Sequence, residues 1–151
     1  MSIFGGVTAE PQPNGITLEQ ARQVIAAAKQ KAVEIGVMMN IAVLDEGADL
    51  VAFERMDGAW RGSIDIAINK AYTARAFDMT SEALGAMSQP GEPIYGIHAS
   101  NDLRVVIFGG GIPLQLGSRI VGAIGVSGGF VPQDIEVAEA GAEAFNRISG
   151  S

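Results

Sequence analysis

The stretch VVIFGGGIPL, residues 105–114, decides the fold, because it joins an apolar run to three consecutive glycines and then to Ile-Pro-Leu. A β-branched apolar run that ends in glycines predicts a strand followed by a tight turn. Two further runs of the same kind follow at short intervals. We therefore expect three strands, at 104–108, 112–116 and 119–127, and the short turns between them require antiparallel pairing.

The three glycines, Gly109, Gly110 and Gly111, do not have the pattern of a nucleotide-binding loop. A P-loop continues into Lys-Ser/Thr and a dinucleotide fingerprint opens a helix, whereas this loop leads into Ile-Pro-Leu. Two interpretations stay open. The glycines serve a tight turn with positive φ, or they bare the backbone so that a flat ligand or a second subunit approaches closely. A second glycine-rich stretch, at 122–129, favours a backbone-lined pocket or interface.

The first third of the chain predicts a helix and a β-hairpin. Thr17 and Gln20 form a capping box that starts the helix, and Gly36 ends it. Strands are expected at 40–44 and 50–54, because the DEGAD between them has turn chemistry.

The remaining elements are helices. Ser63 is expected to cap a helix over 64–77, Thr80 to start a shorter one, and Pro132 to open a closing helix that ends near Asn146. Together the elements predict an α/β (α+β) fold, a five-stranded antiparallel sheet flanked by helices. Residues 1–15 are expected to form an N-terminal arm and residues 16–151 a single domain.

Composition narrows the class of protein. Of the 151 residues 48% are hydrophobic and 18% charged, which is typical of a folded globular chain. The net charge of −7 disfavours nucleic acid as a partner. With no apolar run of membrane-spanning length, no visible secretory signal and no cysteine, we expect a cytoplasmic protein. His98 is the only histidine, which excludes a metal site made of two imidazoles of one chain.

Several motifs occur in an order that is specific as a set. They are the helix at 18–36, AVLDEGADLVAFERMDGA at 42–59, KAYTARAF at 70–77, FGGGIPL at 108–114, RIVGAIGVSGG at 119–129 and QDIEVAEAG at 133–141. The chain thereby resembles the GlcG/HbpS family of small heme-binding and glycolate-operon proteins, whose domain also forms the C-terminal part of some PduO-type proteins. The resemblance covers nearly the whole chain after residue 15.

The resemblance implies a profilin-like sandwich, self-assembly into homo-oligomers and heme as the cofactor, since several relatives bind heme. Some relatives ligate heme through a histidine near the start of the domain, and residues 17–36 of this chain hold none. The hairpin sequence DEGAD also departs from the Gly-Gly pair that is usual in the family.

Two side chains are the leading candidates for chemistry. His98, in YGIHASND, suits proton transfer or ligation of heme iron, because a neutral imidazole serves both. The alternative is an ordinary loop histidine. Arg55, in ERMDGA, suits a bidentate clamp on a ligand carboxylate, and a plain ion pair with Glu54 or Asp57 is the alternative.

Other residues have a less specific pattern. Lys70 is expected to point either at the ligand pocket or into water. Arg104 precedes the glycine loop and would line a polar entrance to that pocket. We expect Trp60 and Tyr72 to be core or interface aromatics, and Asp45 to bond its own hairpin turn.

We expect a small-molecule-binding protein that holds heme against its glycine-lined strands. The residues expected to contact heme are His98, as the iron ligand, with Arg55, Lys70, Arg104, Gly109, Gly110 and Gly111. A first alternative is a cofactor-independent isomerase, lyase or hydratase acting on a small carboxylate, with His98 as acid/base, Arg55 or Arg104 as anchor and the glycine amides as an oxyanion site. A second alternative is a structural or regulatory accessory subunit. Whether the protein is an enzyme stays open.

Overall fold

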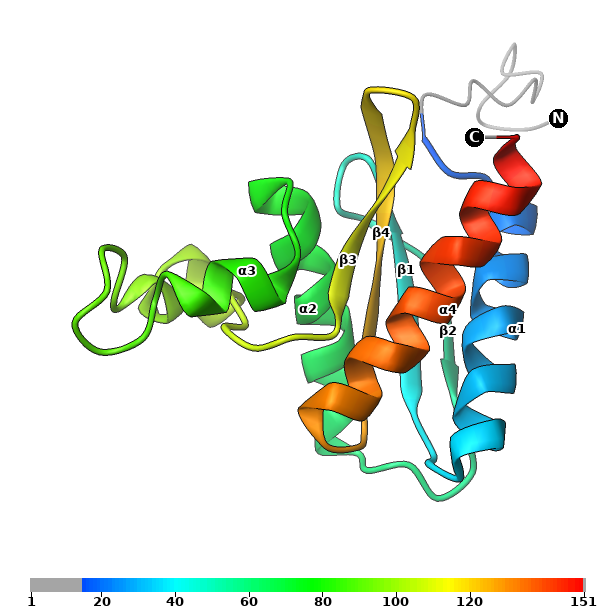
Figure 1. The fold of residues 1–151 in the computed structure, drawn as a ribbon, viewed down its shortest axis with the longest axis horizontal. Helices are drawn as coiled ribbons and strands as arrows, with labels where there is room; N and C mark the ends of the chain where they lie inside the picture. The colour runs from blue at the N-terminus through cyan, green and yellow to red at the C-terminus, as the bar shows by residue number, and fades with distance from the viewer. Residues whose placement is uncertain (1–14, 151) are drawn as a thin grey trace, which may run out of the picture.

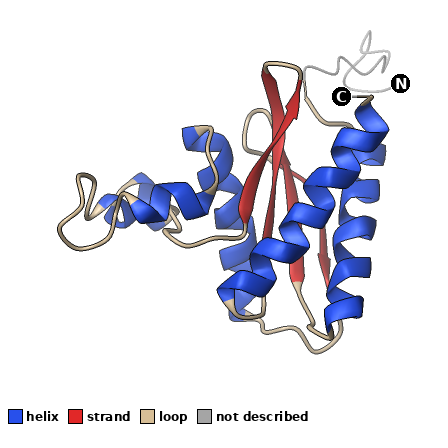
Figure 2. Cartoon of the chain, in the orientation of Figure 1, coloured by secondary structure: helices blue, strands red, loops and turns tan. Residues whose placement is uncertain are grey.

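The structure, a computed structural model, describes residues 15–150. Its four strands are β1 (Asn40–Asp45), β2 (Leu50–Arg55), β3 (Gly111–Leu116) and β4 (Arg119–Ser127), and they form one antiparallel sheet in the order β2-β1-β4-β3. Its helices are α1 (Leu18–Ile35), α2 (Gly62–Phe77), α3 (Ser81–Ala86) and α4 (Val131–Ser149), with short 3-10 turns at Ile97–Ala99 and Asn101–Leu103. The predicted α/β class is confirmed (Figure 2).

Helices cover both faces of the sheet (Figure 1). On one face α1 and α4 lie side by side and form the main core with Ile41, Val43, Ile124 and Val126. On the other face α2 packs through Ala71 and Ala74 against a second, smaller cluster. Successive side chains of a strand point to opposite faces of the sheet, so the same strands contribute to the cores on both faces. The profilin-like description that the resemblance implies stays a prediction.

The predicted fifth strand, 104–108, is wrong, since the sheet of the described residues has four strands. The segment is apolar because it packs on helices rather than on a neighbouring strand. The Val106 N–H donates to the Thr73 hydroxyl of α2 at 2.9 Å. A Cβ at Gly85 of α3 would lie 2.0 Å from the Ile107 carbonyl oxygen. The Val106 N–H thus pairs with a side chain and the Ile107 carbonyl faces a helix, so neither group pairs with a neighbouring strand.

Local capping and turn predictions are confirmed in most places. The Thr17 hydroxyl accepts from Gln20 N–H, Gly36 ends α1 with φ of 76°, and Thr80 caps α3. The Asp45 carboxylate accepts from Gly47 and Asp49 N–H within the hairpin turn.

Two helix boundaries differ from the predictions. Helix α2 starts at Gly62, and its N-cap position, Arg61, makes no side-chain cap bond, so Ser63 is not the cap. Helix α4 runs past Asn146 to Ser149 and has Pro132 in its first turn, as predicted. The predicted N-terminal arm, residues 1–15, lies outside the described residues except for Gly15.

Helix α2 lies close to the sheet because the strands beneath it carry glycine. A Cβ at Gly125 of β4 would lie 2.0 Å from the Ala67 carbonyl oxygen and 2.6 Å from the Ala71 nitrogen, both in the α2 backbone. A Cβ at Gly111 of β3 would lie 2.2 Å from the Lys70 carbonyl oxygen. These glycines let the α2 backbone of the same chain touch the sheet, a use that is not among the two predicted from the sequence.

We predict that Gly125→Ala lowers the free energy of unfolding by about 1–3 kcal/mol, because the α2 backbone must move to admit the methyl group. Urea denaturation measures the loss. Gly62→Ala is the matched control: a Cβ at Gly62 would meet nothing within 4 Å, so this variant should be neutral or slightly stabilising. Equal stability of the two variants would contradict the close packing of α2.

Candidate functional site

Lys70 lies at the centre of the region where the sequence predicts a ligand, and it is completely buried. Its Nζ donates to the Asp134 carboxylate at 2.7 Å and to the Val126 carbonyl at 2.9 Å. The Phe108 ring lies over the same ammonium group, 5.0 Å from its centroid, in cation–π geometry. Three partners therefore surround the ammonium group, which points neither into a hollow nor into water.

Burial shifts both partners of this ion pair toward their neutral forms. It lowers the pKa of Lys70, and the nearby Asp134 charge opposes that shift. It raises the pKa of Asp134, against the Lys70 charge and the N–H groups of Gly128 and Gly129. Nothing in the sequence pattern singles out Asp134, since a carboxylate in the first turn of a helix is ordinary. Only the fold brings it to a lysine that is 64 residues away.

The glycine loop packs against its own chain. Gly110 and Gly111 are buried, and a Cβ at Gly110 would lie 2.8 Å from Lys70 Nζ. A Cβ at Gly109 would lie 2.5 Å from the Ile135 side chain. The adjoining hollow has a volume of about 80 Å³. Within one chain, therefore, Gly110 and Gly111 border this small hollow, and the predicted contact of a ligand or a second subunit with these glycines stays a prediction.

Arg104 is half-buried beside α2. Its Nε donates to Asn69 Oδ1 at 3.2 Å, and its guanidinium lies 3.8 Å from the centroid of the Tyr72 ring. Two neighbouring residues of α2 thus hold the Arg104 side chain in place, while its terminal nitrogens have no hydrogen-bond acceptor among the described residues. Tyr72 is a platform for a cation as well as a packing aromatic.

His98 lies on a segment that projects away from the sheet, residues 87–104, which we call the projecting segment (Figure 1). The imidazole is exposed and meets Tyr95 edge-on, with ring centroids 6.3 Å apart. Tyr95 and Leu103 are large apolar side chains that this segment exposes, at 59% and 74%. Asn101, Asp102 and Leu103 all have positive φ, so the turn that follows His98 is conformationally strained.

Arg55 lies away from these residues. It ends β2, the edge strand opposite β3, whereas the glycine loop leads into β3. The structure thus brings Lys70, Phe108 and the glycines together and holds Arg104 against α2. His98 lies on the projecting segment that Arg104 ends, and Arg55 lies on the edge strand opposite β3.

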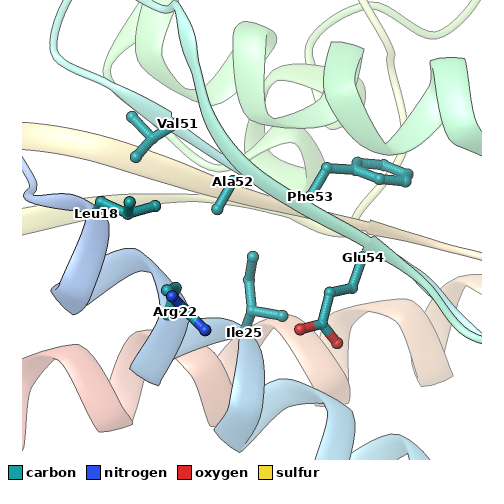
Figure 3. A pocket seen from close by; sticks show the side chains of 7 residues that line it. All are labelled: Leu18, Arg22, Ile25, Val51, Ala52, Phe53 and Glu54. Atoms are coloured by element: carbon teal, nitrogen blue, oxygen red, sulfur yellow. The ribbon is translucent and has the colours of Figure 1, made fainter.

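Two larger hollows occur elsewhere on the described surface. One, of about 300 Å³, lies between α1 and β2 (Figure 3) and is lined by Leu18, Arg22 and Ile25 together with residues 51–54. The other, of about 310 Å³, is formed by the loops at 36–38 and 58–60 with Gly128. His98 lines neither hollow. Sequence patterns do not indicate either of them, because each is made by segments from different parts of the chain.

Residues 15–150 contain no group of three or more His, Cys, Asp or Glu side chains that could hold a metal ion. None of the described helices is long and apolar enough to cross a membrane.

We predict that Lys70→Met lowers the free energy of unfolding by about 3–5 kcal/mol at neutral pH, because it leaves Asp134 buried without its cation. Without that cation the pKa of Asp134 rises further in the folded state. A raised folded-state pKa favours folding at low pH and loses that benefit as pH rises, so the deficit should shrink in acid. Urea denaturation at several pH values measures this.

The double variant Lys70→Met/Asp134→Asn provides the control. The introduced amide keeps an acceptor for the Gly129 N–H without a buried charge, so the double variant should be more stable than Lys70→Met alone. A single variant that unfolds like the wild type, or a deficit that grows in acid, would contradict the buried pair.

Known proteins share this sequence and fold. Residues 16–143 match the family model described as "Haem degrading protein HbpS-like". An uncharacterised 15.0 kDa protein of the dhaT-dhaS intergenic region of Citrobacter freundii is 41% identical over 88% of this chain and 94% of its own. The corrinoid adenosyltransferase PduO of the same organism is 33% identical over 96% of this chain, which spans 43% of the PduO length.

Solved structures agree with the sequence comparisons. Protein ORFY of Klebsiella pneumoniae has a TM-score of 0.86 at 37% identity, over 93% of this chain and 97% of that one. A PduOC:heme complex has a TM-score of 0.83 at 30% identity, over 86% of this chain and 94% of that one. The predicted family is therefore confirmed: the chain belongs to the HbpS-like family, with GlcG among its relatives.

Proposed function

We propose that this protein binds heme. The observation that carries the proposal is the likeness to the PduOC chain of a heme complex, which extends over 94% of that chain. The family description, which names heme degradation, supports the same ligand. The residues that would hold heme in this chain are argued from its own structure.

The projecting segment has the groups that a porphyrin needs. His98 presents an exposed imidazole whose ring nitrogens make no hydrogen bond to the described residues, so a nitrogen is open to ligate iron. Tyr95 and Leu103 offer apolar surface to the macrocycle, and Arg104 offers N–H groups to a propionate. Bound heme supplies an iron whose reactivity the axial ligand sets. These residues fit heme held at the surface of the segment.

We propose that the other residues predicted to contact heme do not contact it in this site. Lys70 lies against the ring of Phe108, a residue that is 42% exposed, and Gly110 and Gly111 pack on Lys70, so in our proposal these residues support the fold beside the projecting segment. Arg55 lies at the far edge of the sheet and takes no part in this site.

We further propose that two or more copies associate through this segment in a cytoplasmic homo-oligomer. One chain leaves Tyr95, Leu103 and His98 open on a single projection, so a second copy would cover the heme face that the first leaves to water. We favour heme over the cofactor-independent enzyme because the Gly111 N–H already donates to Ser81 Oγ, which removes it from an oxyanion site, and because Arg55, on the edge strand opposite β3, leaves Arg104 as the one candidate anchor.

We predict that hemin added to the purified protein gives a saturable Soret band that differs from that of free hemin. His98→Ala should change the band position and weaken binding, because it removes the only imidazole. Arg104→Gln should keep the band position and weaken binding by about tenfold, the value of one charge-assisted hydrogen bond.

Arg119→Gln, an exposed change at the start of β4, is the control and should bind hemin normally. A wild-type spectrum identical to that of free hemin would refute heme binding. An unchanged spectrum of His98→Ala would refute His98 as the ligand and leave heme binding intact.

A further inference from the structure

The hollow of about 310 Å³ at one end of the sheet differs in chemistry from the rest of the surface. It lies where three loops meet: α1–β1, β2–α2 and β4–α4 (Figure 1). We call it the Trp60 hollow. Trp60 is 68% exposed and Met38 50% exposed, so the predicted core or interface aromatic is an open ring beside a thioether. We propose that the Trp60 hollow binds a small planar aromatic carboxylate.

The walls of the hollow suit a flat guest. Gly58 has φ of 85° and contacts Met38, and Gly128 has φ of 149° and lies against the Met38 carbonyl oxygen. With Gly36, at which a Cβ would meet nothing within 4 Å, they make three of the seven lining residues glycine, and the others are Val37, Met38, Ala59 and Trp60. A flat aromatic ring stacks on an indole and on bare peptide planes with little steric conflict. The volume falls at the small end of the range typical of ligand sites.

The floor beneath Trp60 is fixed by a buried amide. Asn40 is fully buried, and its Nδ2 donates to the Trp60 carbonyl at 2.9 Å. The same carbonyl accepts from the Ser63 N–H at 3.2 Å, which ties Trp60 to the first turn of α2. Asn40 Oδ1 has no partner among the described residues. An unsatisfied buried acceptor is costly, and such departures from optimal stability concentrate at functional sites.

No charged side chain of the described residues lines the hollow, but two arginines lie near it in a chain whose net charge is −7. Arg61 directly follows Trp60, and Arg55 is directly opposite Asn40 in the β1–β2 register, which places Arg55 on the α2 face of the sheet. Each arginine is exposed and neither has an ion-pair partner among the described residues, although the exposed Asp57 lies in the same loop. Helix α2 begins beside them without a side-chain cap, which adds partial positive charge. The C-terminal end of α1 at Gly36 adds partial negative charge to the same hollow, so the net positive charge comes from the two arginines. A carboxylate is the complementary group.

The proposal does not rest on heme, because the Trp60 hollow and the projecting segment are formed by different loops. Its test therefore uses colourless ligands and heme-free protein. Trp60 is the only tryptophan, so a ¹⁵N-labelled chain gives one indole N–H resonance that reports on this hollow alone.

We expect benzoate to shift this resonance saturably, together with the backbone amides of residues 36–38, 58–60 and 128. Benzamide lacks the charge and cyclohexanecarboxylate lacks the flat ring, so each should bind at least about fivefold more weakly. Arg55→Gln or Arg61→Gln should weaken benzoate binding by up to about tenfold and leave benzamide binding unchanged. Arg119→Gln should leave both unchanged.

Several results would overturn the proposal. One is the absence of a saturable shift with benzoate, and another is equal affinity for benzoate and benzamide. A third is a shift that is the same in Arg55→Gln, Arg61→Gln and the wild type. Because the arginines are exposed, these variants keep the fold, and their otherwise unchanged amide spectra would establish it. Failure of hemin to bind would leave this result unaffected, so the two proposals can fail separately.

Discussion

The structure depends on keeping the Lys70 ammonium group out of water. A buried ammonium group is strongly unfavourable unless hydrogen bonds and an opposite charge replace its hydration. Here the Asp134 carboxylate, the Val126 carbonyl and the Phe108 ring take that role. These partners belong to α4, β4 and the segment before β3, so one charge on α2 joins four parts of the chain. The glycine loop allows this, because any Cβ on Gly110 would collide with the lysine.

This arrangement changes where a ligand can go. The glycine loop is closed from inside by Lys70 and from outside by Ile135, so the interior next to it is occupied by the protein itself. The surfaces that we assign to ligands are instead the projecting segment with His98 and the Trp60 hollow at the end of the sheet. The projecting segment ends at Arg104, which Asn69 and Tyr72 of α2 hold, and Phe108 of the Lys70 cluster follows four residues later. In our proposal the buried ion pair does not itself contact heme.

How well the fold can be predicted depends on how far apart in the sequence the interacting residues lie. The capping box at Thr17, the Asp45 turn and the start of α4 are set by residues within a few positions, and the sequence predicts them correctly. The segment 104–108 has the pattern of a strand because it is apolar, yet its Val106 N–H donates to α2 and its Ile107 carbonyl lies against Gly85 of α3. Local pattern does not distinguish a run that pairs with a strand from one that packs on a helix.

The candidate sites were harder to predict for the same reason. The sequence pointed to Lys70, but its partner Asp134 is brought close only by folding, and that partner decides that the lysine faces inward. Trp60 is exposed although Asn40, a buried residue 20 positions earlier, holds its carbonyl, and an aromatic residue in a loop gives no sign in the sequence of which side its ring faces. Family membership, by contrast, could be predicted from ordered motifs along the chain, since it needs no knowledge of which residues meet.

The most direct test of the account is a crystal structure of the hemin complex, with the iron located by its anomalous scattering. We expect the iron beside His98 on the projecting segment, with Lys70 still paired to Asp134 and the glycine loop still closed. Iron bound against the main chain of Gly109, Gly110 and Gly111, with the Lys70 pair opened to admit the porphyrin, would contradict it.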